Sequence, residues 1–99
     1  MKYQIIGKNI EVTEGISSAI QTKAARMDKY FLINEDVECR AVVSAHKDVQ
    51  KIELTIFLPA MTLRAEVEDA DLYAAIDLAI DKLEGQMRKL KTRMDRSNA

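Results

Sequence analysis

Hydrophobic and polar residues alternate along four segments of the chain, and this period of two is typical of half-buried β-strands. Residues 2–7 alternate weakly and end at Gly7, whereas residues 37–45, 52–58 and 63–67 alternate clearly. Pro59 stops the third segment, because proline has no backbone N–H to donate to a neighbouring strand. Residues 47–50 are expected to form a hairpin loop. The pattern therefore predicts four short strands.

Two other segments have apolar residues at the three- and four-residue spacing of an amphipathic helix. Thr13 is the expected N-cap of the first helix, with Glu14 in its first turn. Asp69 or Asp71 is the expected N-cap of the last helix. The apolar positions are Ile16, Ala19, Ile20, Ala24, Met27, Tyr30 and Phe31 in the first helix, and Leu72, Ile76, Ile80, Leu83, Met87, Leu90 and Met94 in the last.

The order β-α-β-β-β-α predicts one α+β domain over residues 1–99, with a tail beyond about residue 95 expected to be disordered. A helical crossover makes the first two strands parallel and adjacent, with right-handed connection. Short turns make the last three strands an antiparallel meander. Both helices then cover one face of a four-stranded mixed sheet. The other face is left to water, with Ile6, Val42 and Phe57 on it.

Composition fits a soluble domain rather than a disordered chain, because 47% of the residues are hydrophobic and 31% are charged. No apolar run approaches the roughly 18 residues that a membrane span needs. The single cysteine, Cys39, cannot form an internal disulfide, so a cytoplasmic location is expected. Tryptophan is absent and only five aromatic residues are present, which argues against a surface built on base stacking.

Candidate catalytic groups are few. Cys39 and His46 are the only residues of their types, and they point to opposite faces of one predicted strand. Asp77, Asp81 and Glu84 share one helix face, where they are expected to be a solvated row that complements the helix dipole. The three glycines are dispersed, so no phosphate-binding glycine loop exists. The sequence therefore predicts no enzyme, no metal site and no cofactor.

Charge is distributed in two opposed blocks, although the formal net charge is only −1. Residues 66–84 contain seven acids and one base, whereas residues 85–99 contain five bases and one acid. Lys82, Lys89, Arg93 and Arg96 line one side of the predicted last helix, and Arg88 and Lys91 lie on the other flank of its apolar row. Such a helix suits a phosphate backbone, but its spacing is equally that of a solvated helix end whose charges complement the dipole. Lys23, Arg26 and Lys29 would complete a cationic groove if the two helices lie side by side.

One run of about twenty residues carries a family resemblance. It comprises Asp71-Leu72-Tyr73-Ala74-Ala75-Ile76-Asp77, then Asp81-Lys82-Leu83, Gln86 and Lys89-Leu90-Lys91. Supporting matches are Asn9-Ile10-Glu11-Val12-Thr13, Lys23, Arg26, Tyr30-Phe31, residues 51–56 and residues 62–66. With these residues the chain resembles the ribosome hibernation-promoting factor and ribosome-associated inhibitor family (S30EA-like), and most of all the N-terminal domain of its long form.

The resemblance implies the same β-α-β-β-β-α fold, similar to double-stranded RNA-binding domains. It implies a partner, the small ribosomal subunit with its ribosomal RNA, and neither a membrane nor a small-molecule substrate. Occupying the messenger and transfer RNA channel would inhibit translation and promote ribosome hibernation. The RNA-binding residues carried over by position are Lys23, Arg26, Lys82, Lys89, Lys91 and Arg93. Gly85 departs from the family, which often has arginine there, so one phosphate contact is expected to be lost.

The chain is expected to be either a short member or a domain of a long one, and the resemblance favours the second. Long members carry a further C-terminal domain through which they dimerise and pair ribosomes. Two other functions are open from sequence alone. A generic double-stranded RNA binder would act by shape across minor grooves. A homodimeric interaction module would use the row from Ile76 to Met94 as a coiled-coil seam.

Overall fold

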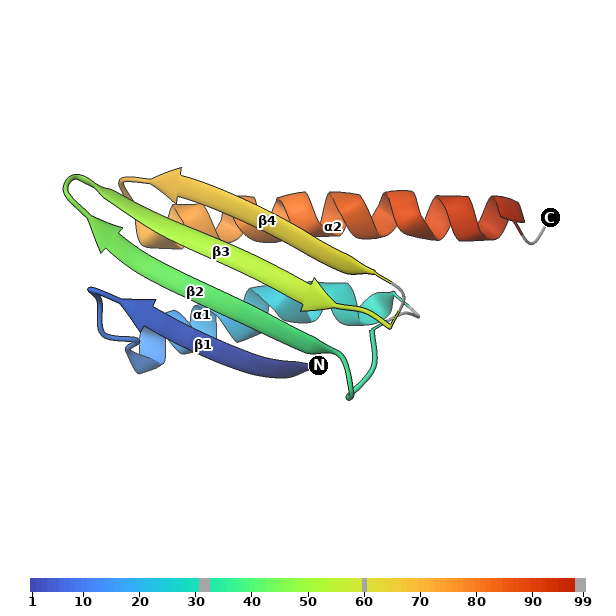
Figure 1. Cartoon of the computed structure of the whole chain (residues 1–99), viewed down its shortest axis with the longest axis horizontal. Coiled ribbons are helices and arrows are strands. Elements are labelled where there is room, and N and C mark those ends of the chain that lie inside the picture. Colours follow the sequence, from blue (N-terminus) through green and yellow to red (C-terminus); the bar gives the residue numbers. More distant parts are fainter. Residues whose placement is uncertain (31–32, 60, 98–99) are drawn as a thin grey trace.

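The structure is a computed structural model that describes residues 1–30, 33–59 and 61–97, with side chains of the last helix described through Arg93. Its elements follow the order β1 (Lys2–Lys8), α1 (Glu14–Ala24), η1 (Ala25–Lys29, a 3-10 helix), β2 (Glu38–His46), β3 (Val49–Phe57), β4 (Thr62–Asp69) and α2 (Leu72–Ser97). The predicted β-α-β-β-β-α order is confirmed (Figure 1).

The four strands form one mixed sheet in the order β1-β2-β3-β4. β1 and β2 are parallel, while β2, β3 and β4 form an antiparallel meander. Ala41 of β2 aligns with Ile5 of β1 and with Leu54 of β3, which places their side chains on the same face. Both helices cover this face (Figure 1), as the connection lengths predict.

The core lies between the helices and the sheet, and every second strand residue contributes to it. β3 shows the alternation most clearly, since Ile52, Leu54 and Ile56 are fully buried and their neighbours are not. From α2, Ile76, Ile80, Leu83 and Met87 are all fully buried. These residues remove apolar surface from water, which is the dominant favourable term in folding.

Several strand ends differ from the prediction by one to three residues, and the largest differences are at the hairpin and at the end of the first helix. Strand pairing continues to His46 and Val49, so the β2–β3 hairpin turn is only Lys47-Asp48 rather than residues 47–50. Asp48 adopts a positive φ of 66°, which aspartate tolerates better than most residues. The first helix becomes a 3-10 helix after Ala24, yet its apolar stripe continues, because Met27 and Tyr30 are buried. Phe31, assigned to that stripe, lies outside the described residues.

Capping side chains begin both helices. Thr13 Oγ1 accepts a hydrogen bond from the Ile16 N–H at 3.2 Å, as predicted. Of the two candidates before α2, Asp71 is the cap, because its Oδ1 accepts from the Tyr73 N–H at 2.9 Å. Asp69 instead accepts from the Asp71 N–H. The 26 residues of α2 span roughly 39 Å, so its C-terminal end projects beyond the sheet (Figure 1).

Candidate nucleic-acid interface

α1 and α2 run in the same direction (Figure 1). Ion pairs join α1 and η1 to the first half of α2 (residues 72–84) in sequence order. Lys23 Nζ lies 2.8 Å from Asp77 Oδ1, and Arg26 Nη2 lies 3.0 Å from Asp81 Oδ1. The next step joins Lys29 Nζ to Glu84 Oε1 at 3.0 Å. The three acids are therefore partners in an interhelical ladder, in which Asp77 and Asp81 are solvent-exposed as expected and Glu84 is not.

Glu84 is the most buried member of this ladder. Its side chain is 11% exposed, and its carboxylate also lies 3.8 Å from Arg26 Nε and 3.7 Å from Arg88 Nη1. The hydrogen bond from Lys29 lowers the pKa of Glu84, and the charges of Lys29, Arg26 and Arg88 act in the same direction against partial desolvation. Glu84 is thus held as an anion among three cations.

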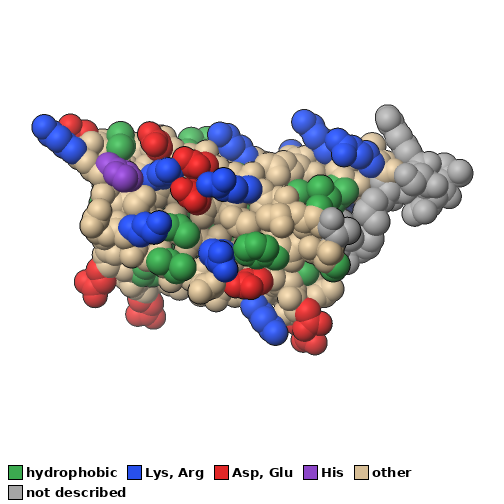
Figure 2. All heavy atoms as spheres, viewed as in Figure 1, with side chains coloured by type: hydrophobic (Ala, Val, Ile, Leu, Met, Phe, Trp, Pro, Cys, Tyr) green, Lys and Arg blue, Asp and Glu red, His purple; other side chains and the backbone are tan. Residues whose placement is uncertain are grey.

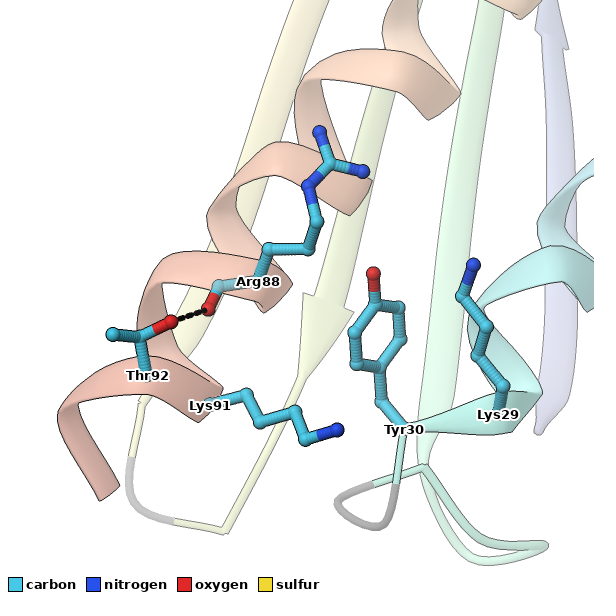
Figure 3. Close-up of a pocket in the computed structure, with 5 residues that line it drawn as sticks. All are labelled: Lys29, Tyr30, Arg88, Lys91 and Thr92. Atoms are coloured by element: carbon cyan, nitrogen blue, oxygen red, sulfur yellow. Dashed lines mark hydrogen bonds between the residues drawn. The ribbon is translucent and has the colours of Figure 1, made fainter. Parts of the chain in front are cut away.

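A cationic groove of about 560 Å³ opens directly beyond Glu84, between η1 and the second half of α2. Lys29, Tyr30, Arg88, Lys91 and Thr92 line it (Figure 3). Lys91 extends from α2 toward Tyr30, and the Lys29 ammonium lies 5.4 Å from the Tyr30 ring centroid. Thr92 Oγ1 donates to the Arg88 carbonyl at 3.0 Å, which leaves the hydroxyl lone pairs available. The helices therefore do form the cationic groove considered from sequence, but at Lys29 rather than at Lys23.

The opposite flank of α2 is also basic. Lys89 and Arg93 border a shallow groove of about 410 Å³ together with Gly85, Arg88 and Thr92. The same two cations border a smaller hollow of about 180 Å³ toward the start of β4, where Met61, Leu63 and Leu90 supply apolar surface. Figure 2 shows Lys and Arg side chains gathered over this half of α2, at the upper right. Cations therefore lie on both sides of the projecting helix.

The six predicted RNA-binding residues fall into two groups. Lys23 and Arg26 are engaged by Asp77 and Asp81 in the ladder. Lys82, Lys89 and Lys91 are exposed and form no ion pair with any residue that the structure describes, and Arg93 is exposed beside Lys89. Their contact with RNA stays a prediction.

The sequence analysis counted Lys29 and Arg88 among the bases of the two helices but left them outside the set of six, although both line the groove. The signal that could have found them is spacing, since Lys29 follows Arg26 by three residues and Arg88 follows Glu84 by four. These spacings place each side chain one helical turn from a ladder member.

The open face of the sheet has balanced charge. Lys51 and Arg64 each pair with both Glu53 and Glu66 at 2.8 to 3.3 Å. Nearby, Arg40 lies over the Phe57 ring at 5.1 Å. Ile6 and Phe57 are exposed there as predicted, whereas Val42 is only half-buried. Figure 2 shows acidic, basic and apolar side chains intermixed on this face. The open face is therefore a weaker candidate for phosphate binding than α2.

The remaining candidates from sequence find no support in the geometry. Cys39 is fully buried, and burial raises the pKa of its thiol to about 11. His46 is exposed, and its Nε2 lies 3.3 Å from Ser44 Oγ. Within the described ranges, no group of three or more potential metal ligands occurs, and no helix is long and apolar enough to cross a membrane. The proposed coiled-coil seam is occupied, because its residues from Ile76 to Met87 pack on the sheet.

Fold and surface together define a class, a small α+β domain that presents a basic helical edge and has no catalytic constellation among its described residues. The chain belongs to the Sigma 54 modulation protein / S30EA ribosomal protein family, whose model matches residues 3–95. This membership confirms the family resemblance seen in the sequence.

Curated relatives are identical to the chain at more than a third of the aligned positions. It is 39% identical over 97 residues to a ribosome hibernation promotion factor of Bacillus subtilis, and 38% identical over 97 residues to that of Lactococcus lactis. The Staphylococcus aureus protein of the same name is 38% identical over 99 residues. The alignments cover 97 to 99% of this chain but 51 to 52% of the relatives. The chain thus spans about half the length of these proteins.

Solved structures match the fold closely. The crystal structure of the Thermus thermophilus Protein Y N-terminal domain aligns with a TM-score of 0.82 and 37% identity, over 91% of this chain and 99% of that one. A ribosomal subunit interface protein from Coxiella burnetii aligns with a TM-score of 0.80 at 22% identity, over 93% and 99% of the two chains, which shows the shared fold alone.

Proposed function

We propose that this domain binds the small ribosomal subunit through ribosomal RNA, occupies the channel for messenger and transfer RNA, and so inhibits translation and promotes ribosome hibernation in the cytoplasm. Relatives named ribosome hibernation promotion factors, 38 to 39% identical, support this proposal. So does the likeness to the Protein Y N-terminal domain, which extends over nearly all of that chain.

The observation that carries the proposal is the second half of α2. Lys89 and Arg93 on one flank, and Arg88 and Lys91 on the other, place positive charge on both sides of a helix that projects beyond the sheet. Phosphate contacts release condensed counterions and supply much of the affinity for RNA. A projecting basic helix can approach phosphates from two directions, as in a confined RNA channel.

Lys23 and Arg26 take part in this proposal differently from the residues of α2. Each would have to exchange a carboxylate of the ladder for a phosphate, so its net gain on binding is smaller. Lys82, Lys89 and Lys91 give up no ion pair with a described residue. We therefore place most of the binding free energy on α2.

The double substitution Lys89→Glu with Arg93→Glu tests the proposal. Both side chains are exposed, so stability should change by about 0.5 kcal/mol or less. Each lost charged contact is worth roughly 1.5–3 kcal/mol, so affinity for small subunits should fall at least ~100-fold. The variant should also no longer inhibit cell-free translation while its circular dichroism stays native.

A matched control uses Lys8→Glu with Lys47→Glu, which changes net charge equally at the opposite end of the molecule. This control should inhibit translation nearly as well as the unmodified domain. If the Lys89 and Arg93 variant folds and inhibits at the same concentration, the basic helix is not the binding surface. Competition between small subunits and free duplex RNA separates ribosome binding from generic duplex binding. A generic duplex binder would be displaced from small subunits by an excess of free duplex RNA, whereas a ribosome-specific domain would stay bound.

A further inference from the structure

Glu84 occupies the point where the acidic half of α2 meets the basic half. Its carboxylate contacts Lys29 at 3.0 Å, Arg88 at 3.7 Å and Arg26 at 3.8 Å. Only 11% of its side chain is exposed, against 53% for Asp77 and 63% for Asp81 in the same ladder. Glu84 therefore differs from the other two acids both in burial and in the number of cations it contacts.

Two of the three cations around Glu84 also line the groove that opens beside it. Lys29 enters the groove from η1 and Arg88 from α2, with Lys91 one turn further along. Like charges at such short range repel one another, and each long side chain has many rotamers. A central carboxylate opposes both effects, because it attracts Lys29 and Arg88 to one point and limits their conformations.

We propose that Glu84 is a positioning residue for RNA binding, which holds Lys29 and Arg88 at the mouth of the groove in the arrangement that receives a phosphate of the RNA. This role rests on the proposed function. A phosphate would approach from the open side of the groove, while Glu84 stays behind the cations and is screened from solvent. Cations fixed before binding lose less freedom when the phosphate arrives, so affinity is higher.

Charge alone predicts the opposite result. Removing any acid makes the domain more positive and should strengthen its attraction to RNA. Asp81 is the natural comparison, because it belongs to the same ladder and pairs with Arg26 at 3.0 Å, but is largely exposed. Removing the Asp81 charge takes away the 3.0 Å partner of Arg26, which keeps only its 3.8 Å contact with Glu84, and removes no partner of Lys29 or Arg88. The two acids thus have opposite expected effects on binding.

The test compares Glu84→Gln with Asp81→Asn, since each substitution keeps the shape and removes one negative charge. Affinity for purified small subunits would be measured at several salt concentrations, with fluorescently labelled protein. We expect Glu84→Gln to weaken binding about tenfold, which corresponds to two cations that are no longer fixed in advance. Asp81→Asn should leave affinity unchanged or strengthen it up to about threefold. Equal strengthening by both variants would overturn the positioning role, because net charge alone would then account for it.

A purely structural role of Glu84 is separated by two further measurements. Thermal unfolding reports any loss of stability, and binding is measured well below the midpoint of the less stable variant. In a Lys29→Gln background, Glu84→Gln should lose most of its effect on affinity, because Glu84 acts through Lys29 and Arg88. An undiminished tenfold loss in that background would contradict the proposal.

If Glu84→Gln does not fold, Glu84→Asp serves instead, since it keeps the negative charge but its side chain is one methylene shorter. Native binding by folded Glu84→Asp would argue against positioning.

Failure of the proposed function gives a different result. If the unmodified domain does not bind small subunits at low salt, ribosome binding is refuted and the role of Glu84 in it falls as well. If the unmodified domain binds and Glu84→Gln binds equally well, only the role of Glu84 is refuted.

Discussion

The two halves of α2 use charged residues in different ways. In the first half, Asp77, Asp81 and Glu84 pair with bases of α1 and η1 above a fully buried apolar row. In the second half, Lys89 and Lys91 form no ion pair with a described residue, and the helix projects beyond the sheet (Figure 1). The first half therefore serves mainly the fold, with Lys82 as its one exposed base, and the second half carries most of the charge that a polyanion can bind.

This difference explains why a net charge of −1 is a poor guide to the function of the domain. Three of the seven acids in residues 66–84 are matched to cations of the neighbouring helix, and Glu66 is matched on the open face of the sheet. In the second half, Lys89 and Lys91 are not matched in this way by any described residue. Local distribution rather than net charge determines the potential that a phosphate meets.

The largest effect on stability should come from the first half. Ile80→Ala removes a fully buried side chain beneath the sheet and should lower the free energy of unfolding by roughly 2–5 kcal/mol. Leu90→Ala, in the second half, truncates a half-buried side chain and should cost about 1 kcal/mol. Urea unfolding followed by circular dichroism measures both. Equal losses would show that the second half is as much a part of the core as the first.

The next effect should appear only in binding. Lys91→Gln removes an exposed cation of the groove and should weaken affinity for small subunits about tenfold with no change in unfolding. The slope of log affinity against log salt should fall by about one, because one phosphate contact is lost. Lys47→Gln, in the hairpin turn, is the matched control and should leave the slope unchanged. A Lys91 variant with the native slope would place the RNA elsewhere.

The fold was largely predictable because its patterns are local. Ile52, Leu54 and Ile56 repeat every two residues, as in a strand, whereas the apolar row from Ile76 to Met87 repeats every three or four, as in a helix. Each element is therefore specified by its own residues. The exact hairpin was not predictable from alternation, since Val49 and Gln50 pair with His46 and Ala45 at the end of the strands. Nor did the apolar stripe reveal the change from α to 3-10 helix after Ala24.

The site was less predictable because it depends on how two distant segments align. Lys29 and Arg88 are 59 positions apart, and only the packing of η1 beside α2 brings them to one carboxylate. The sequence identified the basic character of the last helix. It did not reveal how the two helices align. Lys23 and Arg26 lie opposite acids of α2, whereas Lys29 reaches the groove beside the basic second half of α2.

The smallest expected effect lies at the boundary between the two halves. Gly85 is a helical residue with no positive φ, and a Cβ atom added there would meet nothing closer than the end of the Arg88 side chain at 3.9 Å. Gly85→Ala should therefore raise the free energy of unfolding by about 0.5–1 kcal/mol, because alanine restricts the unfolded chain and favours the helix. Affinity for small subunits should stay within about twofold, since no charge changes. Thermal unfolding and equilibrium binding measure the two quantities. A stabilised variant with markedly weaker binding would show that the junction must bend, and that the two halves of α2 are not one rigid helix when RNA is bound.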